Sequence, residues 1–138
     1  MIEILLVEDN PGHVRLMEEA LKDSSVQCNM DVVTDGVQAM EFLRRQGKFS
    51  SVKRPDLILL DLNLPKKNGR EVLAEVKLDK DLGSIPVVVL TASTDEEDVR
   101  MSYSLQANCY ISKPVNLGEF ANVVKMIENF WGSYVRLP

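Results

Sequence analysis

The feature that most constrains the fold is a set of short, uninterrupted apolar runs that alternate with segments of helical periodicity. The clearest runs are Ile2 to Val7, Leu57 to Leu60 and Val87 to Leu90. A strand that is apolar on both faces must be covered on both faces, as in a parallel sheet between layers of helices. The alternation therefore predicts a doubly wound α/β chain whose helices connect parallel strands by right-handed crossovers.

Periodicity predicts five strands and five helices. The expected strands are Ile2 to Val7, Asp31 to Val33, Leu57 to Leu60, Val87 to Leu90, and Tyr110 with Ile111. The expected helices are Pro11 to Asp23, one with Val37, Met40 and Leu43 that stops near Gly47, Gly69 to Leu78, Asp95 to Gln106, and a last one lined by Leu117, Phe120, Val123, Val124, Ile127 and Phe130. The polar segment Gln46 to Arg54 is expected to be an extended loop.

Length and charge narrow the class of protein. At 138 residues the chain suits one domain, residues 1–138, with no output domain attached. A net charge of -5 argues against direct nucleic-acid binding, which needs a basic face. The apolar runs are too short to span a membrane, and no signal peptide follows Met1. We therefore expect a cytoplasmic protein.

Polar residues of particular types follow the ends of the expected strands, where open parallel sheets bind their ligands. Glu8 and Asp9 follow the first strand, Asp61 the third, and Lys113 the fifth, while Thr91 follows the fourth. All five are therefore expected at one edge of the sheet. Three carboxylates that close repel one another unless a cation intervenes, and all-oxygen donors suit Mg²⁺.

The same residues predict phosphoryl transfer. A carboxylate can attack phosphorus to give an acyl phosphate, and Asp61 is the candidate because it ends the middle apolar strand. Mg²⁺, the hydroxyl of Thr91 and the ammonium of Lys113 can together neutralise the transferring group. Asp9 is then chiefly a metal ligand.

This set of residues resembles the receiver domains of two-component response regulators (CheY-like) over essentially the whole chain. The family has an acidic pair after the first strand, an acceptor Asp after the third, a Thr or Ser after the fourth, and Lys-Pro after the fifth. Here these are Glu8 with Asp9, Asp61, Thr91, and Lys113 with Pro114. Thr91 lies 30 residues and Lys113 52 residues after Asp61, as is typical of the family.

The resemblance implies a (βα)5 flavodoxin-like three-layer sandwich with a five-stranded sheet of order 2-1-3-4-5. It further implies that the backbone carbonyl of Asn63 binds Mg²⁺, that the peptide bond before Pro114 is cis, and that Gly69 has positive φ. Thr91 and Tyr110 are then the switch residues that move on phosphorylation. The implied partner is a sensor histidine kinase, and the implied function is phosphorelay signalling with self-catalysed phosphorylation and dephosphorylation, not turnover of a separate substrate.

Within the family the chain is most similar to stand-alone regulators that partner bacterial phytochromes. The similarity lies in the opening Glu8-Asp9-Asn10-Pro11, the long segment before the third strand, and the ending Phe130-Trp131 with Leu137-Pro138. The apolar residues after that last helix are more than a helix end needs, which suggests a homodimer through the C-terminal region. His13 stands where such proteins often carry Asp, and we expect a solvated surface residue without a role.

Each site residue also has an ordinary structural reading, as a helix cap, a turn residue or a solvated charge. Two other functions compete as well. An aspartyl-phosphate hydrolase needs a second Asp two residues after the nucleophile, where this chain has Asn63. A flavin or nucleotide module needs a phosphate-binding loop where this chain has Glu8 and Asp9. A phosphorylation-independent interaction module is the remaining alternative.

Overall fold

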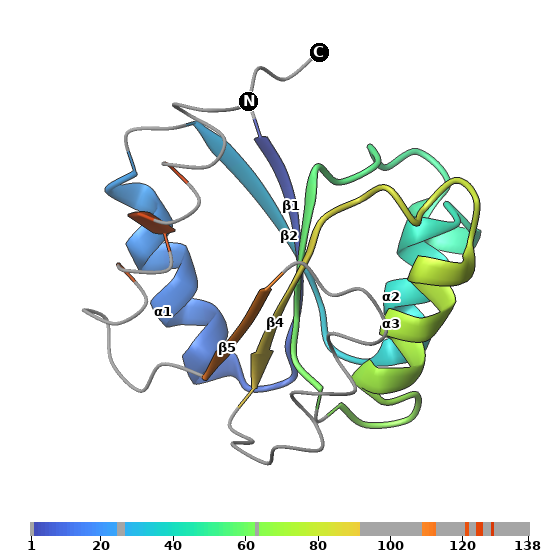
Figure 1. Ribbon diagram of the computed structural model, residues 1–138. Helices are drawn as coiled ribbons and strands as arrows, with labels where there is room; N and C mark the ends of the chain where they lie inside the picture. The colour runs from blue at the N-terminus through green and yellow to red at the C-terminus, as the bar shows by residue number, and fades with distance from the viewer. Residues whose placement is uncertain are drawn as a thin grey trace.

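Five parallel strands form one sheet through the middle of the molecule (Figure 1). The computed structural model describes residues 2–24, 27–62, 64–91, 109–112, 121, 124, 125 and 128, with residues 91 and 109–112 described by their backbone. The strands are β1 (Ile2–Val7), β2 (Cys28–Val33), β3 (Leu57–Leu60), β4 (Val87–Thr91) and β5 (Cys109–Ser112). Their order is β2-β1-β3-β4-β5, which confirms the expected topology and makes β3 the central strand.

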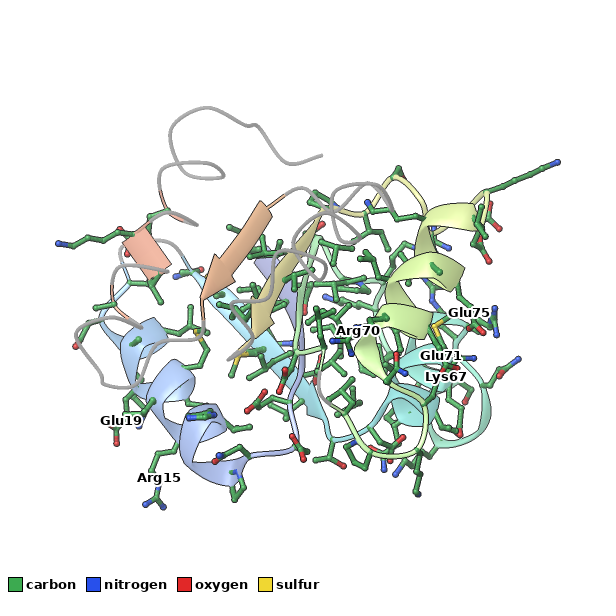
Figure 2. The ribbon with its side chains drawn as sticks, turned by 60° about the horizontal axis from the view of Figure 1, so that its bottom comes forward. Arg15, Glu19, Lys67, Arg70, Glu71 and Glu75 are labelled. Atoms are coloured by element: carbon green, nitrogen blue, oxygen red, sulfur yellow. The ribbon has the colours of Figure 1, made fainter. Side chains whose placement is uncertain are left out.

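Helices cover both faces of the sheet. Helix α1 (Pro11–Lys22) lies on one face, and α2 (Gly36–Leu43) and α3 (Gly69–Leu78) lie on the other (Figure 1). Arg15 and Glu19 project from α1 away from the sheet (Figure 2). The three-layer α/β architecture expected from the alternation of elements is therefore confirmed.

The two layers of helices enclose two separate apolar cores. Along β1, Leu5 and Val7 pack in the core under α2 and α3, whereas Ile4 and Leu6 pack in the core under α1. This division follows from the two-residue period of a strand, which sends successive side chains to opposite faces. All four are nearly inaccessible to solvent, and each buried aliphatic side chain contributes about 1.5–3 kcal/mol to stability.

Strand β2 is longer than the sequence predicts, since it begins at Cys28 rather than Asp31. It pairs with β1 along its whole length, from Ile2 opposite Cys28 to Val7 opposite Val33. As an edge strand it is largely exposed on one side, so its residues alternate between polar and apolar. The apolar pair Val32 and Val33 therefore marks only the end of this strand, and its start has no continuous apolar run.

The segment from Gln46 to Arg54 is not wholly extended, contrary to expectation. It contains a short 3₁₀ helix, η1 (Gly47–Phe49). The ring of Phe49 packs against Phe42 of α2, with 5.2 Å between ring centroids, and Val52 also packs against the core. Two apolar side chains in a polar stretch thus fold the segment back onto α2.

The expected helix from Asp95 to Gln106 lies outside the described residues, as does most of the last expected helix. Of the latter, Ala121, Val124 and Lys125 are helical, and Val124 is buried in the core under α1. Among the described residues, none of the helices has the length and apolar composition needed to cross a membrane.

Candidate functional site

The carboxyl ends of β1 and β3 bring three acidic residues together. These two strands are neighbours, with Val7 opposite Leu60 as their last paired residues. Glu8 therefore follows β1 at the same level at which Asp61 follows β3. The backbone N–H of Asp61 donates to the carbonyl oxygen of Val7 at 3.1 Å, which extends the pairing by one residue. The sheet register thus places both carboxylates side by side.

One oxygen from each of Glu8, Asp9 and Asp61 lies within 4.8 Å of the others. Glu8 is 3% exposed and Asp61 4% exposed, whereas Asp9 is exposed. Two buried carboxylates this close repel each other strongly, because little water screens them. The sequence-based expectation that these three residues converge is confirmed.

The donor set of this cluster fits a divalent metal ion. All three side chains offer carboxylate oxygens, which are the ligands that hard divalent cations prefer. A cation there would remove the repulsion among them. Asp9 is the exposed member of the cluster, so solvent reaches it. The acidic cluster is therefore a candidate divalent-metal centre.

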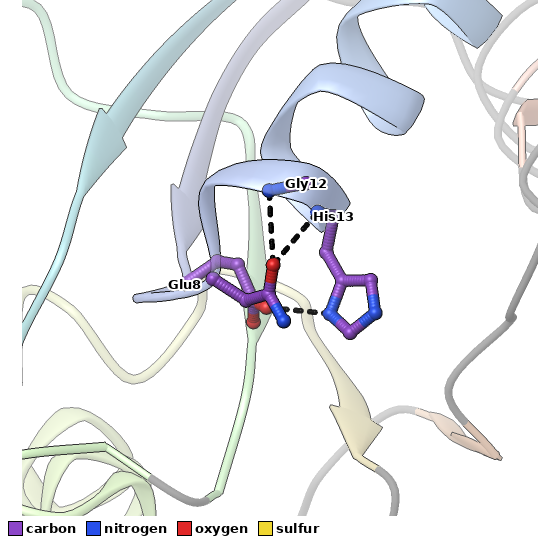
Figure 3. Close-up of polar contacts among 4 residues, drawn as sticks. Glu8, Gly12 and His13 are labelled. Carbon is purple, nitrogen blue, oxygen red and sulfur yellow. Dashed lines mark hydrogen bonds and ion pairs between the residues drawn. The ribbon is translucent and has the colours of Figure 1, made fainter.

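Helix α1 begins directly beside this cluster. Asn10 caps it, because its side-chain oxygen accepts from the backbone N–H of Gly12 at 2.9 Å and of His13 at 3.3 Å (Figure 3). Pro11 occupies the first helical position, where a missing N–H has no cost. The cap sets where the first turn of α1 lies relative to Glu8.

His13 contacts the acidic cluster, which the sequence reading missed. Its Nδ1 lies 3.1 Å from Oε1 of Glu8, and its side chain is 28% exposed (Figure 3). The expectation of a solvated surface residue was therefore wrong, because the side chain is only partly exposed and contacts Glu8. The available signal was its place in the first turn of a helix, since side chains there point back toward the helix N-terminus.

The loop between β3 and α3 is held tightly against its surroundings. A Cβ added to Gly69 would lie 2.1 Å from the carbonyl oxygen of Asp61, and one added to Gly36 would lie 1.9 Å from that of Lys67. These two glycines let α3 and α2 approach the loop that carries Asp61. Gly69 does not have positive φ, so the reason inferred for this glycine was wrong: the requirement is close backbone approach.

Among the described residues of this loop, Lys66 has positive φ, at 62°. Its Nζ lies 3.6 Å from Oδ2 of Asp35, a buried carboxylate that also caps α2 by accepting from the N–H of Gln38. The next residue, Lys67, forms an ion pair with Glu75 of α3. The loop is thus tied to both helices of its layer.

The remaining expected site residues are placed only in part. Thr91 is the last residue of β4, next to β3, and its backbone lies opposite Ser112 of β5 at the edge where Asp61 lies. Tyr110 lies in β5 opposite Val89. Asn63, Lys113 and Pro114, including the expected cis peptide bond, lie outside the described residues.

Comparison with known proteins gives a consistent result. The family model described as "Response regulator receiver domain" matches residues 4–125. Response regulator Rcp1 of Synechocystis sp. is 53% identical over 135 residues, which cover 98% of this chain and 92% of that protein.

Two solved structures are also similar to this chain. The phosphorylated cyanobacterial phytochrome response regulator RcpA has a TM-score of 0.91 at 53% identity, over 99% of this chain and 98% of that one. The Mn²⁺-bound form of response regulator Rcp1 also has a TM-score of 0.91, at 51% identity, over 100% of this chain and 99% of that one.

Proposed function

Because this chain belongs to the response regulator receiver domain family, we propose that Asp61 accepts a phosphoryl group from a sensor histidine kinase. One observation carries the proposal: Asp61 ends the central strand, 4% exposed, with carboxylate oxygens of Glu8 and Asp9 within 4.8 Å. A carboxylate in that position can act as a nucleophile, and a bound metal ion can stabilise the negative charge around it.

The metal in this proposal is Mg²⁺, held by Glu8, Asp9, Asp61 and the backbone carbonyl of Asn63. When bound, it supplies positive charge to the oxygens of the transferring phosphoryl group. The carboxylates fit this role because Mg²⁺ binds through few carboxylates and keeps several waters. A Mn²⁺-bound form of the similar Rcp1 supports a divalent ion as the cofactor of this chain.

Asp61 attacks the phosphorus of phosphohistidine through a carboxylate oxygen. The new O–P bond forms as the N–P bond breaks, and the histidine, whose other ring nitrogen carries a proton, leaves as a neutral imidazole. The ammonium of Lys113 and the hydroxyl of Thr91 stabilise the charge on the phosphoryl oxygens. Water later hydrolyses the acyl phosphate in the same site, so the chain assists both reactions on itself and is not an enzyme with a separate substrate.

The added charge then shifts the domain toward a second arrangement through Thr91 and Tyr110. Their positions support this, because β4 and β5 both end at the edge where Asp61 lies. A partner that binds only the second arrangement reads the signal. Phosphorylation would therefore act by changing the populations of two states.

The proposed kinase is of the phytochrome type. The support is indirect: the similar RcpA is described as a phytochrome response regulator. Residues 1–138 would act as a receiver domain in the cytoplasm. A homodimer through the C-terminal region is part of the same proposal, and that region lies outside the described residues. A monomeric mass by light scattering at micromolar concentration would contradict the dimer.

Intact mass after incubation with acetyl phosphate and Mg²⁺ tests the acceptor. We expect one phosphoryl adduct on the native chain, and none with Asp61→Asn or with EDTA. An adduct that persists in Asp61→Asn would assign the acceptor elsewhere. Absence of any adduct, with Mg²⁺ shown to bind, would favour the phosphorylation-independent interaction module.

A steady-state phosphatase assay separates the proposal from an aspartyl-phosphate hydrolase. We expect no rapid multiple turnover of a phosphomonoester, because Asn63 stands where the hydrolase needs its general acid. Rapid turnover would favour the hydrolase instead.

A further inference from the structure

His13 and Glu8 form a contact that neither the acceptor chemistry nor the metal ligand set requires. The Nδ1 of His13 lies 3.1 Å from Oε1 of Glu8 (Figure 3). When Glu8 is a carboxylate, as a metal ligand is, it can only accept in this pair, and the imidazole then donates its Nδ1–H. The inference below rests on the proposed function, because it takes Glu8 to be a metal ligand.

The helix cap determines where His13 lies. Asn10 accepts from the backbone N–H of His13 as well as from that of Gly12. This fixes the first turn of α1, and side chains of a first turn point back toward the helix N-terminus. The imidazole is therefore directed at the residue that follows β1.

Glu8 needs such a partner because of where it is buried. Its side chain is 4% exposed, so few waters can orient it, and it lies next to the carboxylates of Asp9 and Asp61. Repulsion from these two carboxylates favours rotation of the Glu8 carboxylate away from the cluster. The hydrogen bond between His13 and Oε1 of Glu8 opposes that rotation.

We propose that His13 is a positioning residue of the metal centre: it holds the Glu8 carboxylate in the orientation that binds the divalent ion. Partners of metal ligands commonly change metal affinity by about 10–100-fold when they are removed. His13 thus sets the metal affinity of this chain without touching the metal.

The test measures Mn²⁺ binding directly, from the electron paramagnetic resonance signal of free Mn²⁺, for the full chain at one fixed pH. We expect His13→Ala to raise the dissociation constant by about tenfold. His13→Gln keeps an N–H donor and should stay within about threefold of the native value. Arg15→Ala, on the outer side of the same helix, is the matched control and should not change it.

Adduct formation with acetyl phosphate gives a second readout. His13→Ala should need more Mn²⁺ for its half-maximal rate, yet reach the native rate at saturation. A native-like dissociation constant in His13→Ala would overturn the inference, and so would equal weakening in His13→Ala and His13→Gln. Failure of the native chain to bind Mn²⁺ or to form an adduct would instead overturn the proposed function.

Discussion

Gly69 determines how closely α3 approaches the acceptor residue. Its backbone lies so near Asp61 and Leu62 that a Cβ would overlap the carbonyl oxygen of the former and approach the Cα of the latter at 2.6 Å. Both neighbours are backbone atoms at the end of the central strand, so neither can turn aside as a side chain can. The geometry of the acceptor thus depends on a residue that has no side chain.

Replacing Gly69 by alanine should lower the free energy of unfolding by about 1–3 kcal/mol, because the new methyl group forces backbone apart. The same displacement should slow adduct formation at Asp61. Urea unfolding and intact mass measure the two effects. Gly12→Ala is the matched control for the stability measurement alone, since its Cβ would approach the side chain of Asn10, at 3.2 Å, rather than the backbone of the central strand. Equal stability of the native chain and Gly69→Ala would contradict the assignment.

His13 illustrates what a residue-by-residue reading of the sequence cannot find. The acidic residues could be assigned because their role follows from where strands end, which the apolar runs reveal. The contact between His13 and Glu8 instead depends on the cap at Asn10 and on the rotamer of an imidazole. Neither produces periodicity in the sequence, so an isolated histidine looked like an ordinary surface residue.

At the scale of elements, the start of α2 and the loop after β3 support each other. Asp35 caps α2, with the N–H of Gln38 donating to Oδ1 at 2.8 Å, and faces Lys66 with its other oxygen. Asp35 is buried, whereas the Lys66 side chain is 67% exposed. The cap should therefore contribute much more to stability than the ion pair does.

Asp35→Ala should lower the free energy of unfolding by about 1 kcal/mol through loss of the cap. Lys66→Ala should lower it by less than about 0.5 kcal/mol, because water screens an exposed pair. Urea unfolding of both variants and of the double variant measures the contributions of the cap and of the ion pair to the free energy of unfolding. A larger effect from Lys66→Ala would mean that the ion pair, not the cap, holds the loop.

The turn after α3 should make stability depend on acid pH. The backbone N–H groups of Leu82 and Asp81 donate to Oδ1 of Asp79, and these hydrogen bonds lower the pKa of its carboxyl. A lowered pKa stabilises the folded state fully above the ordinary value of about 3.9, and this stabilisation is lost as the pH falls below it.

The native chain should therefore exceed Asp79→Ala in stability at neutral pH, and the difference should shrink below about pH 4. Urea midpoints measured from neutral to acid pH give this difference directly. A difference that stays constant over the whole range would show that the charge of Asp79 is not involved.

Most elements were predictable because their signal is local. β3 and α3 were predicted with their observed bounds, since both combine a clear apolar pattern with clear ends. The start of β2 and the short helix η1 were not, because both depend on pairing or packing with a distant partner. The chemistry of the site was predictable because parallel strands must end at a common edge.

For the whole molecule, metal binding and folding should be coupled. The cluster needs β1 and β3 paired, so a divalent ion binds the folded chain and not the unfolded one. Ligand at 100 times its dissociation constant stabilises a folded protein by about 2.7 kcal/mol.

Mg²⁺ at that level should therefore raise the free energy of unfolding of the native chain by about 2.7 kcal/mol over its value in EDTA. Asp61→Asn should gain less than half as much, because it lacks one ligand. Asp81→Asn, which changes a carboxylate in the turn after α3, should gain as much as the native chain. Urea unfolding measures all three. The same gain in Asp61→Asn would place the metal elsewhere.

The two cores on either side of the sheet should let the two faces of the molecule change in sequence independently. Among the described residues, the buried side chains under α1 and those under α2 and α3 form separate clusters, so substitutions in one layer should add to those in the other rather than interact. One face can therefore change to suit a new partner while the other keeps its packing. Substitutions in either layer must leave the carboxyl ends of the strands in position, because Asp61 lies there.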